Sequence, residues 1–155
     1  MKGSKPLIDK LNALLAAELT AINQYMVHSE MDENWGYGKL HEIEHKRAIV
    51  EMKHAEKLIE RIIFLDGRPI VSKLDEIRIG QDVPKMIESD LNLEYGAVKK
   101  YNEAVKLAQD VGDNSTKTVL EGILNDEIAH VDELEERLDQ ISQMGIQNFL
   151  TTVTD

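Results

Sequence analysis

The sequence contains no cysteine, and this absence alone excludes several classes of protein. A chain without thiols cannot form disulfides, iron–sulfur clusters or thiolate zinc sites, and it offers no thiol nucleophile. Proline and aromatic residues are also scarce, with 3 prolines and 5% aromatics in 155 residues, and this composition favours helices. Because a chain without cysteine suits a reducing compartment, we expect a cytoplasmic protein.

Long apolar runs and an excess of basic residues are missing as well. Runs such as residues 62–65 are far shorter than the roughly 20 residues that cross a bilayer. Asp9 and Lys10 interrupt the apolar stretch that a signal peptide would need. With 18 Lys and Arg against 29 Asp and Glu, the formal net charge is −11. We therefore expect neither nucleic acid nor a membrane as a partner, and the acidic balance suits a protein that attracts cations.

Helical periodicity dominates what the sequence does contain. Apolar residues recur at the 3.6-residue period over four long segments, about residues 6–34, 39–65, 84–111 and 115–144. We expect Ser4, Asp82 and Ser115 to cap three of these helices. Glycine-containing turns separate the segments, and residues 146–150 are expected to form one further short helix.

The connections between the predicted helices differ in length. The first and third are short turns, whereas residues 67–82 form a long connection whose apolar residues should lie across the bundle. Short, long and short connections in this order describe a ferritin-like arrangement. We therefore predict an all-α fold in a single domain over residues 1–155. It is a four-helix bundle with one long crossover and a short fifth C-terminal helix.

The two halves of the chain repeat their titratable residues at one constant offset. A shift of 76 positions takes Glu18 to Glu94, Glu51 to Glu127 and His54 to His130. The same shift takes Tyr25 to Tyr101. Each half therefore carries one isolated Glu and one Glu-x-x-His. One such motif on a helix is usually a solvated pair, but two copies in the same register point to a shared site.

These six residues fall on the apolar faces of their helices. Burying even one unpaired carboxylate costs several kcal/mol, so four together require protons, buried cations or metal ions. The second helix places Lys46, Lys53 and Lys57 on its opposite face, so they do not supply the cations. Two divalent ions would balance four carboxylates. Oxygen and imidazole ligands suit iron or manganese and also accept zinc, and the spacing is that of di-iron and di-manganese carboxylate proteins.

Beyond these residues, the chain resembles the bacterioferritins along nearly its whole length. The matching stretches are residues 1–3, 21–25, 34–36, 51–55, 79–80 and 144–145. The resemblance implies iron storage in a homo-oligomeric 24-subunit shell built of dimers, with a ferroxidase that oxidises Fe(II) with O2 or H2O2. It also implies two iron ions per subunit. Glu51 and Glu127 would bridge them, Glu18 and His54 would complete one site, and Glu94 and His130 the other.

The resemblance also bears on Met52 and Tyr25. Spacing alone favours Met52 as a packing residue at a helix–helix contact. In the family, however, this methionine from two subunits ligates one haem iron, which implies one haem per subunit pair at a two-fold interface. Such a haem would relay electrons from a reductant of the ferredoxin type to release stored iron. Tyr25 is expected either to donate a hydrogen bond behind the ligand Glu18 or to be an ordinary buried tyrosine.

One alternative function remains open on the sequence. The same bundle could hold a redox enzyme with two manganese or iron ions and no storage role, such as a catalase or an oxidase. The sequence leaves open the oxidant, the type of haem and the presence of a second kind of subunit in the shell. His28 has no counterpart in the repeat, so we interpret it as structural.

Overall fold

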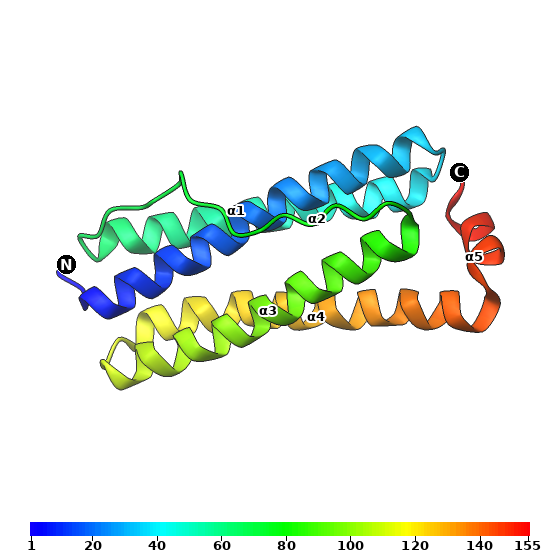
Figure 1. The fold of residues 1–155 in the computed structure, drawn as a ribbon. Helices are drawn as coiled ribbons and strands as arrows, with labels where there is room; N and C mark the ends of the chain where they lie inside the picture. Colours follow the sequence, from blue (N-terminus) through cyan, green and yellow to red (C-terminus); the bar gives the residue numbers. More distant parts are fainter.

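The computed structural model describes all 155 residues and is entirely helical, which confirms the predicted fold class (Figure 1). The helices are α1 (Lys5–Asn34), α2 (Gly38–Phe64), α3 (Val83–Asp110), α4 (Asn114–Met144) and α5 (Ile146–Val153). Helices α1 to α4 form the bundle, and α5 lies across one end of it. None of the helices has an apolar stretch long enough to span a bilayer.

The helix termini correct several details of the sequence-based expectations. The side chain of Asp82 caps α3 as predicted and accepts a hydrogen bond from Lys85 N at 2.9 Å. Ser115 does not cap α4, because Asp113 occupies that place and accepts from Thr116 N at 3.0 Å. Ser4 stands at the start of α1 without a capping hydrogen bond. Helix α5 is three residues longer than expected, since burial extends as far as its last residue.

Two helical hairpins build the bundle, one from α1 and α2 and the other from α3 and α4. Between them, residues 65–82 run the length of the bundle as an extended crossover (Figure 1). Helix α3 therefore starts at the end of the bundle where α2 also starts, and these two helices run in the same direction. This topology brings the middles of all four long helices to one level.

The crossover is held to α1 by its own backbone. Its N–H groups at residues 70, 75, 78 and 80 donate to the side chains of Asn12, Thr20, Gln24 and His28, respectively, at 2.8–3.1 Å. Apolar burial contributes less, because Val71 is 60% exposed. A Cβ atom on Gly80 would lie 2.2 Å from Met86 N, so the chain can approach α3 closely only with glycine there. His28 is structural in this arrangement, as interpreted.

Two apolar clusters fill the bundle on either side of its middle. The larger cluster joins the first half of α1 and the second half of α2 to α3 and α4, and it includes Leu11, Leu58 and Tyr101. The second cluster joins α2, α3 and α4 to Phe149 and Val153 of α5. Between the two clusters, the core becomes polar. This central layer holds the repeated glutamates and histidines.

Candidate metal centre

Each of the four long helices contributes to the central layer. Two overlapping groups have ligand atoms within 4.8 Å of one another: Glu18, Glu51, His54 and Glu127, and Glu51, Glu94, Glu127 and His130. The two groups share Glu51 and Glu127. The structure thus brings together all six residues that the repeat singled out, and every one of them is buried.

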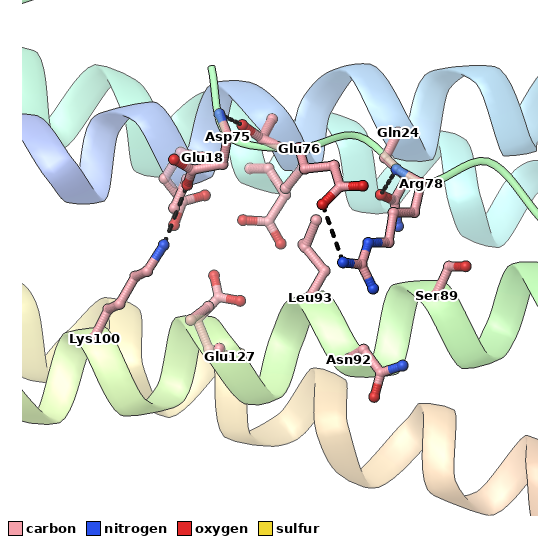
Figure 2. A pocket seen from close by; sticks show the side chains of 16 residues that line it. Glu18, Gln24, Asp75, Glu76, Arg78, Ser89, Asn92, Leu93, Lys100 and Glu127 are labelled. Atoms are coloured by element: carbon pink, nitrogen blue, oxygen red, sulfur yellow. Dashed lines mark hydrogen bonds and ion pairs between the residues drawn. The ribbon is translucent and has the colours of Figure 1, made fainter. Parts of the chain in front are cut away.

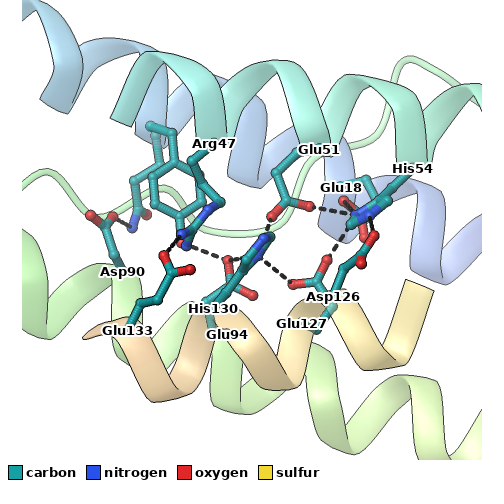
Figure 3. A network of polar contacts seen from close by, with 12 residues as sticks. Glu18, Arg47, Glu51, His54, Asp90, Glu94, Asp126, Glu127, His130 and Glu133 are labelled. Atoms are coloured by element: carbon teal, nitrogen blue, oxygen red, sulfur yellow. Dashed lines mark hydrogen bonds and ion pairs between the residues drawn. The ribbon is translucent and has the colours of Figure 1, made fainter. Parts of the chain in front are cut away.

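Both histidines turn Nδ1 toward the carboxylates (Figure 3). His54 Nδ1 lies 2.9 Å from Glu127, 3.1 Å from Glu51 and 3.6 Å from Glu18. His130 Nδ1 lies 3.2 Å from Glu51, 3.6 Å from Glu94 and 3.7 Å from Glu127. The two rings stack with centroids 6.3 Å apart. One N–H on each ring cannot serve three carboxylates, so most of these contacts are not hydrogen bonds.

Ligand atoms at this centre consequently lack hydrogen-bond partners. They are Glu18 Oε2, Glu51 Oε1, Glu94 Oε2, Glu127 Oε1 and His130 Nδ1. A buried polar atom without a partner costs about 1–3 kcal/mol, and charged groups cost more. Carboxylate oxygens and imidazole nitrogens are the donors that iron and manganese accept. The residues present therefore fit a pair of metal ions, which would give these atoms their missing partners.

Two tyrosines hold the isolated glutamates, and each reaches across to the other hairpin. Tyr25 donates a hydrogen bond to Glu94 at 2.5 Å, and Tyr101 donates to Glu18 at 2.6 Å. The expected contact of Tyr25 with Glu18 is therefore wrong, because the side chain points between the hairpins. The repeat matched Tyr25 with Tyr101, but spacing on one helix could not show the crossed pairing.

Without metal ions, protons reduce the repulsion between the carboxylates. Burial and the charge of Glu51 raise the pKa of Glu18 well above its usual range, and burial raises the pKa of Glu94 to about 7. Burial opposes a charged His130, but its contacts with Glu127, Glu51 and Glu94 raise its pKa to about 11. The pKa of His54 is raised for the same reason. Metal ions that bind here would displace protons.

Two further charged residues near the centre escaped the sequence analysis. Arg47 is buried beside the ring of Tyr25, with its guanidinium carbon 5.8 Å from the ring centroid, and pairs with Glu133 at 2.6 Å. Asp126 lies 2.8 Å from the second ring nitrogen of His54. Both could have been identified from their positions in the sequence, because Arg47 lies one helical turn before Glu51 and Asp126 directly precedes Glu127.

A cavity of about 270 Å³ reaches the centre from the side of the crossover (Figure 2). Glu18, Glu51 and Glu127 line it. At the crossover, Asp75 pairs with Lys100 of α3 at 3.1 Å. Glu76 pairs with Arg78 at 3.0 Å. The cavity thus extends from the crossover to three carboxylates of the centre, which are themselves buried.

Met52 projects away from the centre. Its side chain is 47% exposed, so it is not packed into a helix–helix contact within this chain. Val27 of α1 and Trp35, just after this helix, are also exposed, and both line an open groove with Met26 and Met31. The α1–α2 hairpin therefore exposes several large apolar side chains.

A second buried acidic cluster lies beside the centre, nearer the start of α3. It comprises Asp32, Glu44 and Asp90, each with one oxygen that lacks a hydrogen-bond partner. His28 Nδ1 and Gln24 Nε2 both contact Asp90, at 2.9 and 2.8 Å. Burial and the charge of Asp90 raise the pKa of Glu44 to about 8. These groups support the crossover and were not predicted as a cluster.

The fold is a four-helix bundle, and its central layer groups carboxylates and imidazoles that could hold metal ions. The family model of the ferritin-like domain matches residues 8–144. The chain is 43% identical to a bacterioferritin of Rhodobacter capsulatus and 40% identical to one of Brucella melitensis, each over 96% of this chain and 92% of the relative. It is 37% identical to a bacterioferritin of Streptomyces coelicolor over 100% of this chain and 93% of the relative.

The chain therefore belongs to the ferritin-like family and, within it, to the bacterioferritins.

The buried Glu44 predicts a specific pH dependence of stability. Its native pKa of about 8 exceeds the ordinary value of 4.5, so between these values the native state binds a proton that the unfolded chain does not. Its contribution to the free energy of unfolding is present at pH 5 and is lost as the pH rises toward 9. Glu44→Gln cannot titrate, so the variant should gain stability relative to wild type over this range, by on the order of 1–4 kcal/mol.

Urea unfolding of the metal-free proteins at pH 5, 7 and 9 measures this difference. Glu42→Gln, at an exposed position on the same helix, is the control and should follow wild type. If the free energy of unfolding of Glu44→Gln changes with pH in parallel with that of wild type, Glu44 is already ionised in the native state.

Proposed function

We propose that this chain oxidises Fe(II) at the central layer and stores the ferric product in a cytoplasmic shell of 24 copies. The observation that carries the proposal is the set of six buried ligands, five of which present partnerless atoms to one another. The ferritin-like domain and the similarity to bacterioferritins support the same function. Iron is here the substrate and the cargo of the protein.

The electron balance requires two iron ions for each oxidant molecule. Two Fe(II) ions, O2 and two protons give two Fe(III) ions and H2O2. With H2O2 as the oxidant, two Fe(II) ions and two protons give two Fe(III) ions and two water molecules. Four carboxylates neutralise two Fe(II) ions, whereas two Fe(III) ions leave uncompensated charge in the core. This excess favours transfer of the product to the mineral.

The residues around the centre would divide the work. Glu51 and Glu127 belong to both groups and would bridge the two ions. Glu18 with His54 and Glu94 with His130 would complete the two sites. Tyr101 and Tyr25 would hold Glu18 and Glu94 in place through their hydrogen bonds. The cavity beneath the crossover would admit Fe(II), because three ligand carboxylates line it.

A redox enzyme with two manganese or iron ions and no storage role is the competing proposal. The ligand set suits that function equally well, because it requires the same oxygen and nitrogen donors. The number of metal ions that the protein retains distinguishes the two functions. An enzyme retains only the ions that its ligands bind, whereas a storage protein retains a mineral.

The first test is an aerobic Fe(II) titration of metal-free protein, with the iron counted that elutes with the assembled particle. Storage predicts many tens of ions per chain. A plateau at roughly two ions per chain would contradict it and favour the enzyme. Replacing Glu94 and His130 by Ala should slow initial oxidation by about tenfold or more, since one metal position loses the two ligands that it does not share with the other. Glu88→Ala, exposed on the same helix, is the matched control.

We further propose that Met52 ligates a haem between two copies of the chain, with one haem per pair. Its side chain is 47% exposed, and the same hairpin also exposes Val27, so a soft ligand and apolar contacts are both available. When bound, the haem would supply electron transfer. A protein reductant of the ferredoxin type would then reduce the stored iron through it.

Haem reconstitution tests this assignment. Wild type should bind one haem per two chains with the absorption spectrum of two sulfur ligands, and Met52→Leu should lose that spectrum because leucine cannot ligate. Met144→Leu is the matched control at another exposed methionine. Unchanged haem content and spectrum in Met52→Leu would contradict the assignment.

A further inference from the structure

The two histidines of the centre differ in what holds the ring nitrogen that faces away from the ligands. His54 Nε2 lies 2.8 Å from Asp126 Oδ2 (Figure 3). The contacts of His130 with charged side chains, to Glu51, Glu94 and Glu127, all involve Nδ1, and no side chain lies against Nε2 as Asp126 lies against His54. The contacts that face the ligands are otherwise alike. His54 Nδ1 lies 2.9 Å from Glu127, and His130 Nδ1 lies 3.2 Å from Glu51.

The internal repeat shows why the two rings differ. Asp126 on α4 directly precedes Glu127 and reaches across to His54 on α2. The equivalent position on α2, 76 residues earlier, is Val50, directly before Glu51. A valine has no acceptor for His130. The repeated tyrosines, in contrast, hold their glutamates at 2.5 and 2.6 Å in both halves.

Arg47 is a second departure from the internal repeat, and it also disfavours metal binding at the position of Glu94 and His130. Its counterpart 76 residues later is Ile123, so only one half of the centre has a buried guanidinium nearby. Arg47 lies over the ring of Tyr25, whose hydroxyl donates to Glu94. A fixed positive charge on this side disfavours a cation held by Glu94 and His130.

We propose that the two metal positions are unequal, with Asp126 as the positioning residue that makes the His54 position the tighter one. A carboxylate that accepts the Nε2–H fixes the tautomer of His54, turns the Nδ1 lone pair toward the metal and makes the imidazole a stronger donor. His130 lacks this support. The position of Glu18 and His54 therefore fills first, and the ion held by Glu94 and His130 exchanges more readily. This inference rests on the proposed two-metal centre.

Anaerobic titration of the metal-free protein with Co²⁺, followed by calorimetry and visible absorption, tests the inequality. Co²⁺ binds the same donors and reports its ligands through its colour. Wild type should show two resolved steps of one ion per chain each. His130→Ala should remove the weaker step and leave the tighter one, which assigns the two steps to their positions.

Two substitutions with opposite effects then test Asp126 itself. Asp126→Asn should weaken the tighter step by about 10–100-fold and leave the weaker step in place. Val50→Asp should strengthen the weaker step, because it restores the missing acceptor beside His130. A gain in affinity cannot result from misfolding. Asp139→Asn makes the same charge change at an exposed position of α4 and should alter neither step.

Equal affinities for the two ions in wild type would overturn the inference while leaving the two-metal centre intact. So would an Asp126→Asn variant that weakens both steps alike, or a Val50→Asp variant whose weaker step does not move. If the wild-type protein binds no Co²⁺ at the centre, the proposed function itself fails, so the two failures are distinguishable.

Discussion

The structure depends on the burial of four carboxylates between two apolar clusters. No lysine enters this layer, and the nearby Arg47 pairs with Glu133 instead. In the metal-free chain, imidazole charges and bound protons compensate part of the charge, and several oxygens stay without partners. This costs stability that a chain selected only for folding would not give up. Two divalent ions would remove the cost, so the core itself favours the binding of metal ions.

The rest of the fold keeps this layer in place. The crossover lets α2 and α3 run in the same direction, so that each hairpin offers one isolated Glu and one Glu-x-x-His at the same level. The hydrogen bonds of the crossover to α1 and the buried acidic cluster around Asp90 secure it against the bundle. Because Tyr25 and Tyr101 cross between the hairpins, the geometry of each half depends on the other.

Much of this arrangement could be predicted from the sequence, because periodicity fixes helix faces and the 76-residue offset fixes register. The four-helix bundle and the meeting of all six candidate ligands both follow from these two patterns. Contacts between helices could not be predicted, since they depend on how side chains reach across the core. Tyr25 was matched to the wrong glutamate for this reason, and Asp126 was overlooked although it precedes a ligand. The predicted cap of α4 was wrong, because Asp113 competes with Ser115 for this role within the same turn.

The most direct test of the central claim is anomalous diffraction from crystals of the metal-free protein soaked anaerobically with Fe²⁺. Data collected at the iron edge should show two peaks in each chain. One peak should lie among Glu18, Glu51, His54 and Glu127, and the other among Glu51, Glu94, Glu127 and His130. Iron found only on the acidic surface, with the central layer unchanged, would contradict the account.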